Sequence, residues 1–147
     1  MKRYLGLDLG TKTLGVAYSD LMGFTAQSLE IISIDSANNN FGLKRLKEIV
    51  KEYQIDEFVL GYPKNMNNTV GVRAKASEDF KKKLESKFKL PVHLVDERLS
   101  TVAANRVLVK EADVSRRKRK KAVDKLAASF ILQTYLDRNY KLGEKND

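Results

Sequence analysis

The first third of the chain alternates short apolar runs with turn-forming residues. Residues 4–9 and 13–19 are two apolar runs joined by Gly-Thr-Lys, a pattern that predicts a β-hairpin. Residues 23–34 form a third run, rich in β-branched residues, which is followed by Asp-Ser and a cluster of asparagines. The three runs therefore predict three antiparallel strands connected by short turns.

Beyond residue 40 the apolar residues recur at helical spacing. This spacing predicts a first helix over residues 41–54 and a second helix after Gly71, whereas wholly apolar runs at 58–60 and 92–95 predict buried strands. A third helix would be capped by Ser100 or Thr101, and a fourth follows the basic run at 116–121. The predicted apolar stripe of the second helix is Val72, Ala76, Phe80, Leu84 and Phe88, and that of the fourth is Val123, Leu126, Ala127, Phe130, Ile131 and Thr134.

This order of elements, β-β-β-α-β-α-β-α-α, predicts an α/β fold built on a five-stranded mixed sheet. Three antiparallel strands come first, helix and strand then alternate, and helices cover both faces of the sheet. The ribonuclease H-like fold is a common architecture with this order. Chain length and the lack of a linker or repeat indicate a single domain over residues 1–138, followed by a polar tail at 139–147.

Composition narrows the available chemistry. The chain has no cysteine and one histidine, which excludes thiol nucleophiles, disulfides, thiolate zinc sites and histidine clusters. The histidine, His93, is interpreted as a core or edge residue. No apolar run approaches the roughly 18 residues of a membrane span and no secretory signal is recognisable, so we expect a cytoplasmic protein. Carboxylates, amines, hydroxyls and backbone groups must carry any catalysis.

Charge indicates the class of partner. The net charge is +9, and from Arg98 onward 13 Lys and Arg face 6 Asp and Glu. Residues 116–121 are all basic, and Arg116, Arg117 and Arg119 are among them. A local excess of positive charge of this size favours a polyanion as the binding partner. Nucleic acid is favoured over an anionic membrane, because no helix beside the run presents bulky apolar residues outward.

Acids on separate elements indicate a metal site. Asp8 lies near the end of the first strand, Asp96 and Glu97 end the last strand, and Asp124 opens the final helix. Acids at strand ends and at a helix start can converge outside a mixed sheet. Divalent cations bound among these carboxylates would offset their mutual repulsion. A site with oxygen ligands and no His or Cys selects Mg²⁺ or Mn²⁺. Strand alternation leaves open whether Asp96 or Glu97 enters the site, and structural roles stay open for every acid.

Two such ions would suit phosphodiester hydrolysis, because one activates a water molecule and the other stabilises the departing oxygen. Candidates to hold phosphate flank the acids. They are Thr11 and Lys12 in the first turn, Arg73 at the start of the second helix, and Arg98 after the last strand. Tyr62 could stack on an unpaired base, although packing is the more common role of an aromatic residue beside proline.

Four segments of the chain resemble the YqgF family of Holliday-junction-resolvase-like proteins, which are also described as pre-16S rRNA nucleases. They are Asp-Leu-Gly-Thr-Lys at 8–12, the segment from Gly61-Tyr62-Pro63 to Arg73, residues 96–101 and residues 121–128. The resemblance covers nearly the whole chain, and it implies a ribonuclease H-like nuclease with Asp8, Glu97 and Asp124 as its acidic triad. It also implies a role in maturing the 5′ end of the small-subunit rRNA precursor. Tyr62 departs from the aliphatic residue usual at its position in the family.

Other functions stay open beside this one. A four-way DNA junction is an alternative substrate for the same hydrolysis, and its symmetric cleavage generally needs two sites across a two-fold axis. The protein could also bind nucleic acid without cleaving it. Residues 8–17 further resemble the first phosphate loop of the actin, Hsp70 and sugar-kinase group, although those proteins hold ATP between two such domains. We expect a structured rRNA precursor as the main partner, no membrane, and a monomer or weak dimer.

Overall fold

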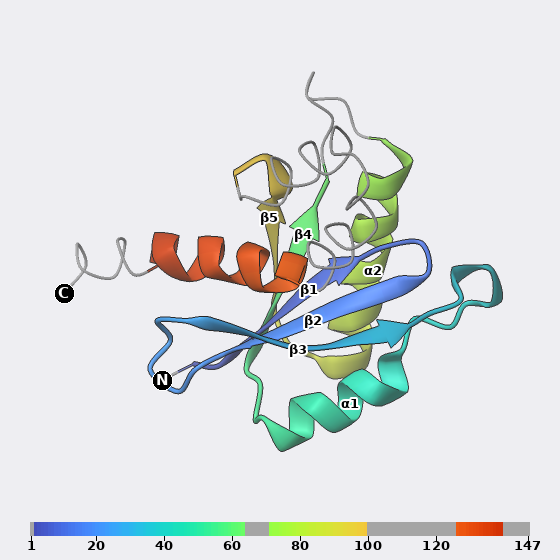
Figure 1. Ribbon diagram of the computed structural model, residues 1–147. Helices are drawn as coiled ribbons and strands as arrows, with labels where there is room; N and C mark the ends of the chain where they lie inside the picture. Colours follow the sequence, from blue (N-terminus) through green and yellow to red (C-terminus); the bar gives the residue numbers. More distant parts are fainter. Residues whose placement is uncertain (1, 64–70, 100–125, 140–147) are drawn as a thin grey trace, which may run out of the picture.

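A computed structural model describes residues 2–63, 71–99 and 126–139 of the chain (Figure 1). We call the helix at residues 126–139 the C-terminal helix. The helix predicted after Ser100 and the predicted polar tail beyond residue 139 lie outside the described residues. The labelled elements are β1 (Tyr4–Leu9), β2 (Thr13–Ser19), β3 (Ala26–Ser33), α1 (Leu43–Glu52), β4 (Glu57–Tyr62), α2 (Val72–Phe88) and β5 (Val92–Asp96), with short 3-10 turns at Ser36–Asn38 and Glu97–Leu99.

The five described strands form one mixed sheet in the order β3-β2-β1-β4-β5. β1, β2 and β3 are antiparallel neighbours, as the apolar runs predicted. β1, β4 and β5 run parallel, with Leu7 opposite Leu60 and Leu60 opposite Leu94. The carboxyl ends of these three strands therefore meet at one edge of the sheet, which we call the carboxyl edge. The predicted five-stranded mixed sheet is confirmed.

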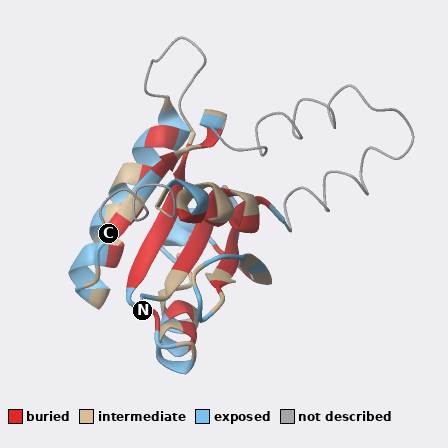
Figure 2. Ribbon diagram, turned by 90° about the vertical axis from the view of Figure 1, so that its left-hand side faces the viewer, coloured by how far each residue is buried: buried red, intermediate tan, exposed pale blue. Residues whose placement is uncertain are grey.

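Helices cover both faces of this sheet (Figure 1). On one face, α1 and α2 pack over a cluster of buried residues that includes Leu5 and Leu7 of β1. On the other face, the C-terminal helix packs over a smaller cluster that includes Val59 and Val95. Figure 2 shows buried residues throughout the central strands and on the helix sides turned toward them. Because strand side chains alternate, consecutive residues of β1 face different helices.

Two of the predicted helix stripes are wrong in part. On α2, Val72 is 89% exposed and Ala76 is also exposed, whereas the buried residues are Ala74, Ser77, Phe80 and Leu84. A strict spacing of four drifts around a helix of 3.6 residues per turn, so it leaves the buried face within a few steps. On the C-terminal helix, Leu126 is exposed and Phe130 and Thr134 are half-buried. The residues that this helix buries in the core are Ala127, Ala128, Ile131, Leu132 and Leu136.

The edge of the sheet opposite the carboxyl edge carries a polar and aromatic cluster. Glu57 of β4 is 7% exposed, and its Oε1 lies 3.0 Å from Nε2 of His93 on β5. The His93 ring stacks on Tyr135 of the C-terminal helix, with ring centroids 5.0 Å apart, and Tyr135 meets the ring of Tyr4 edge-on at 5.3 Å. These contacts confirm the interpretation of His93 as an edge residue of the core.

None of the helices within residues 2–63, 71–99 and 126–139 combines the length and the apolar character that a membrane span needs.

Candidate active site at the carboxyl edge

Asp8 stands in the second-last position of β1, opposite Gly15 of β2. Its neighbours Leu7 and Leu9 both belong to the apolar cluster under α1 and α2. Alternation along the strand therefore turns Asp8 to the other face, which the C-terminal helix covers. Only 7% of Asp8 is exposed, so the carboxylate lies in a partly desolvated environment at the carboxyl edge.

Glu97 reaches the same face from β5. It follows Asp96, the last residue of the strand, and it is 7% exposed. Its Oε1 atom lies 3.2 Å from the point where a side-chain carbon on Gly61 would stand. Gly61 comes one residue after Leu60, the partner of Leu7, so it lies beside Asp8 on the neighbouring strand. The carboxylates of Asp8 and Glu97 thus flank Gly61 on the face under the C-terminal helix.

Asp96 is directed differently. Its carboxylate accepts hydrogen bonds from the backbone N–H of Arg98 at 3.0 Å and from the Arg98 guanidinium at 2.6 to 3.1 Å. The bond to Asp96 raises the pKa of Arg98 above its usual range. Asp96 is therefore the partner of Arg98. Arg98, predicted to hold phosphate, therefore has its guanidinium engaged by an acid of its own chain.

Two glycines bring the C-terminal helix close to the acids. A side-chain carbon on Gly6 would stand 2.7 Å from Cβ of Leu132 and 3.0 Å from the backbone oxygen of Ala128. On Gly61 it would stand 2.6 Å from Cδ1 of Ile131. Real side-chain carbons do not approach other atoms so closely, so at position 6, where the neighbours are a Cβ and a backbone oxygen, only glycine allows the helix to lie this near the sheet. At position 61 the neighbour is the end of the flexible Ile131 side chain, which would have to shift. Ala128, which lies against Gly6, is fully buried at this close contact.

The third predicted metal ligand and the basic run are not among the described residues. Asp124 precedes the first described residue of the C-terminal helix by two positions and lies outside the described residues. The same holds for Arg116, Arg117 and Arg119. Within the residues that the structure describes, no group of three or more His, Cys, Asp or Glu is arranged to hold a metal ion.

The predicted phosphate-holding residues near the edge are exposed. Thr11 and Lys12 occupy the turn between β1 and β2, which is closed by a hydrogen bond from the Gly10 N–H to the Thr13 carbonyl at 2.9 Å. Arg73 is the second residue of α2, which starts at the carboxyl edge because it follows the end of β4. All three side chains are therefore accessible to a bulky anionic substrate.

Tyr62 does not have the exposure that base stacking requires. It is 7% exposed, and its hydroxyl donates to Oε1 of Glu78 on α2 at 2.6 Å. This hydrogen bond raises the pKa of Tyr62 above its usual range. The base-stacking role is thus wrong and the packing role is confirmed, because the ring joins β4 to α2.

Comparison with known proteins places the chain in a family. The family model named RuvX and described as Holliday junction resolvase matches residues 2–138. This chain belongs to the RuvX family. The resemblance to the YqgF family is confirmed. A Streptococcus uberis relative is 60% identical over 94% of this chain and 99% of its own length. A Geobacillus relative is 64% identical over 92% of this chain and 97% of its own length, and both carry the name "Putative pre-16S rRNA nuclease".

Solved structures support the fold. RuvC of Thermus thermophilus, solved in complex with a Holliday junction substrate, matches with a TM-score of 0.51 at 12% identity, over 95% of this chain and 97% of that one. A structure of Thermus thermophilus RuvC matches with a TM-score of 0.50 over 93% and 96% of the two chains. At this identity the likeness concerns the fold, and the predicted ribonuclease H-like architecture is confirmed by it.

Proposed function

We propose that the protein is a metal-dependent endonuclease that hydrolyses phosphodiester bonds of the 16S rRNA precursor, near the 5′ end of the mature RNA. The observation that carries the proposal is the placement of two buried carboxylates, Asp8 and Glu97, on one face of the carboxyl edge. Burying like charges together raises their energy unless cations accompany them. Cation-binding chemistry is therefore the simplest reason for this pair in a family of nucleases.

The donor set fits Mg²⁺ or Mn²⁺. Both residues offer hard carboxylate oxygens, the type of ligand that these ions prefer, and the chain has no cysteine to select a softer metal. Asp8 and Glu97 would hold the ions together with Asp124, and two ions would suit the three carboxylates and a phosphodiester. When bound, such ions supply an activated water molecule and stabilise the departing oxygen. The protein's own share is to fix the carboxylates and to present Thr11, Lys12 and Arg73 to the substrate phosphates.

RNA is the favoured substrate because of the names that two relatives carry. The two relatives at 60% and 64% identity, matched over nearly their whole length, both carry names that specify the 16S rRNA precursor. The net charge of +9 supports binding to a nucleic acid, because polyanions attract basic proteins from a distance and release counterions on binding.

Substitutions of the two buried acids and of their neighbour Asp96 test the proposal. Asp8→Asn and Glu97→Gln should each reduce cleavage of a precursor RNA to the level seen with chelator, while circular dichroism shows an unchanged fold. Asp96→Asn is the control, because it removes a neighbouring charge that pairs with Arg98. This variant should keep cleavage that depends on Mg²⁺ or Mn²⁺. Undiminished cleavage by purified Asp8→Asn protein would falsify the proposal.

A second candidate is cleavage of a four-way DNA junction, which the description of the matching family model favours. The chemistry at Asp8 and Glu97 would be the same, so the acid variants do not separate the two substrates. A synthetic junction and a precursor RNA, each incubated with Mg²⁺, Mn²⁺ or chelator on one gel, do separate them. Sedimentation adds a further criterion, because symmetric junction cleavage calls for a dimer and a strictly monomeric protein would oppose it.

A further inference from the structure

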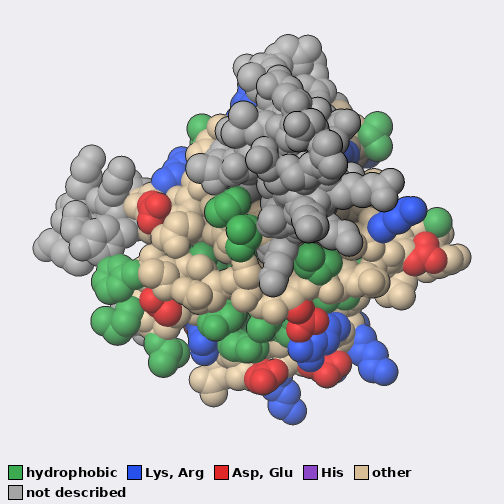
Figure 3. All heavy atoms as spheres, viewed as in Figure 1, with side chains coloured by type: hydrophobic (Ala, Val, Ile, Leu, Met, Phe, Trp, Pro, Cys, Tyr) green, Lys and Arg blue, Asp and Glu red, His purple; other side chains and the backbone are tan. Residues whose placement is uncertain are grey.

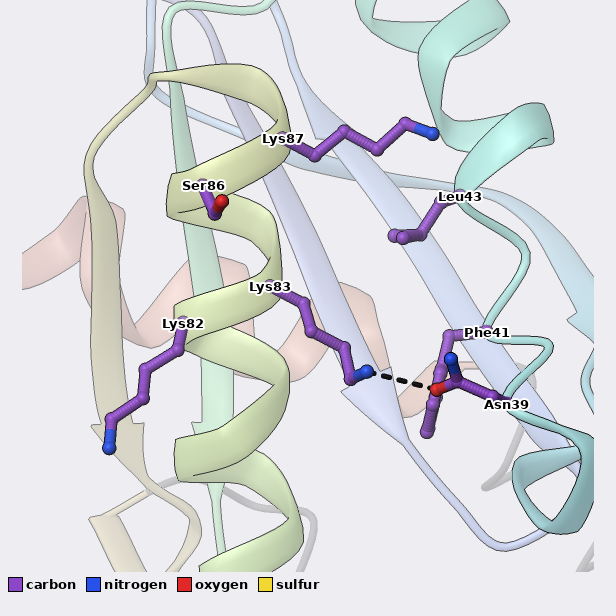
Figure 4. A pocket seen from close by; sticks show the side chains of 7 residues that line it. All are labelled: Asn39, Phe41, Leu43, Lys82, Lys83, Ser86 and Lys87. Carbon is purple, nitrogen blue, oxygen red and sulfur yellow. Dashed lines mark hydrogen bonds between the residues drawn. The ribbon is translucent and has the colours of Figure 1, made fainter.

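A basic groove lies between α2 and the loop that leads from β3 to α1 (Figure 4). We call it the α2 groove, and it has a volume of about 360 Å³. Three of its seven lining residues are lysines and none is an acid. The lining residues are Asn39, Phe41, Leu43, Lys82, Lys83, Ser86 and Lys87.

The positive charge of the α2 groove is not balanced by its own walls. Figure 4 shows Lys83 and Lys87 extending from α2 toward the facing loop and α1, whereas Lys82 extends along another side of the helix. Lys83 and Lys87 are four residues apart, a spacing at which like charges destabilise a helix slightly. By contrast, Lys81 on the same helix lies 4.0 Å from a carboxylate oxygen of Glu85. An anion from outside the chain would offset the repulsion in the groove.

The groove is suited to phosphate groups and not to bases. The Lys83 ammonium is held by the side-chain oxygen of Asn39 at 2.9 Å, so one cation has a fixed position. The same ammonium lies 5.1 Å from the centre of the Phe41 ring, and that ring packs against Phe80 with centroids 5.7 Å apart. Because the one aromatic residue of the lining already has these partners, it is not available to stack on a base. Recognition in the groove would therefore be independent of sequence.

Hydrogen bonds join the groove to the carboxyl edge. The Ile34 N–H donates to the Lys12 carbonyl at 2.9 Å, and the Ser36 hydroxyl lies 3.5 Å from the Thr11 carbonyl, so the loop that carries Asn39 rests on the turn beside Asp8. α2 starts at the same edge, and Lys83 stands about 16 Å further along the helix at 1.5 Å per residue. The acids lie on the face under the C-terminal helix and the groove lies on the opposite face, so a chain that leaves the acids would have to bend around this turn to reach the groove.

We propose that the α2 groove binds the sugar-phosphate backbone of a single-stranded RNA segment that flanks the cleaved bond. This inference rests on the proposed function insofar as the substrate is RNA. Lys83 and Lys87 would each neutralise a phosphate, and Ser86 and Asn39 would add polar contacts at the wall. The groove would thereby lengthen the contact with the substrate beyond the acids.

Binding without cleavage tests the inference. The double variant Lys83→Gln/Lys87→Gln is compared with Lys47→Gln/Lys51→Gln, a pair of exposed lysines at the same spacing on α1 that does not line the groove. Lys51 and Lys87 both lie in the last turn of their helices, where a positive charge is favourable. Each double variant therefore loses one such charge, so this effect is the same in both. Affinity for a single-stranded RNA of mixed sequence is measured by anisotropy in chelator over a series of salt concentrations.

In the groove variant, the plot of log affinity against log salt should become less steep by about 1.4, which is about 0.7 for each of the two single-strand phosphates that are no longer neutralised. The control variant should change this slope far less. Equal changes in both variants, or no change in the groove variant, would overturn the inference. Preferential loss of binding to poly-glutamate instead of RNA would also overturn it, since the partner would then be an acidic protein. If the groove variant unfolds, Lys87→Gln alone is compared with Lys51→Gln. Because chelator prevents cleavage, the outcome is independent of the Asp8→Asn test.

Discussion

Gly61 is predicted to position Glu97, the proposed metal ligand, and the replacement of Gly61 by alanine tests this role. The added methyl would stand 2.6 Å from Cδ1 of Ile131 and 3.2 Å from Oε1 of Glu97. Ile131 would have to move its terminal methyl by about 1 Å to reach an ordinary carbon contact. Glu97 would have to move by a few tenths of an ångström. The first displacement affects stability, whereas the second affects ion binding.

The two effects differ in size and can be measured separately. Overpacking of a core typically costs about 1–3 kcal/mol, which we expect as a lowered free energy of unfolding in urea. Mg²⁺ demands near-ideal octahedral geometry, and ligand distances in metal sites are held within about 0.2 Å. We therefore expect Gly61→Ala to raise the Mg²⁺ concentration for half-maximal RNA cleavage by about tenfold. Mn²⁺ binding without RNA should weaken in parallel.

A second substitution separates the causes. Ile131→Val removes the terminal methyl that clashes, so Gly61→Ala/Ile131→Val exchanges one methyl for another in nearly the same space. Swaps that conserve volume usually cost less than about 1.5 kcal/mol, so stability should largely return. The raised ion requirement should persist, because the contact with Glu97 is unchanged. Recovery of both properties in the double variant would show that the contact between Gly61 and Glu97 has no part in ion binding.

Two further predictions concern the C-terminal helix and the opposite edge of the sheet. Gly6→Ala should lower the free energy of unfolding by about 1–3 kcal/mol, because the added methyl would meet the Ala128 backbone oxygen at 3.0 Å. A urea titration of this variant that matches that of the unaltered protein would contradict the close packing. Burial raises the pKa of Tyr4 to about 12, and negative charge on Tyr135 and Glu57 adds to the shift. The folded state thus favours the neutral phenol, so its stabilisation is complete below pH 10 and is lost as pH rises toward 12. Thermal melts of Tyr4→Phe should show a shallower alkaline decline, and an unchanged decline would assign it to other groups.

The strands were predictable from sequence because their signals are local. Apolar runs bounded by turn residues identified β1, β2 and β3, and short, wholly apolar runs identified β4 and β5. The buried stripe of α2 was not predictable in the same way, since Ala74 and Ser77 are small residues that give little contrast with Ala76. Their burial depends on how closely α2 approaches β4, which is a property of the assembled layers.

In the candidate site, too, the local signals were predictable from the sequence and the long-range contacts were not. Strand alternation required Asp96 and Glu97 to face opposite sides, but it could not say which side the C-terminal helix covers. That choice depends on contacts such as the one between Gly61 and Ile131, which are far apart in sequence. The glycines themselves offered a signal that our sequence analysis did not use, because an isolated glycine in an apolar strand often marks a close approach.

The position of β4 between β1 and β5 has a consequence for how the protein is made. The meander of β1, β2 and β3 consists of local pairings, whereas Tyr4 meets Glu57 only after a long loop has closed. During synthesis the meander can form before β5 has left the ribosome, and at that stage Asp8 has no second acid beside it. Glu97 joins Asp8 only when β4 and β5 have been added in order. A nuclease with this topology would be inert as a nascent chain, while it is surrounded by ribosomal RNA.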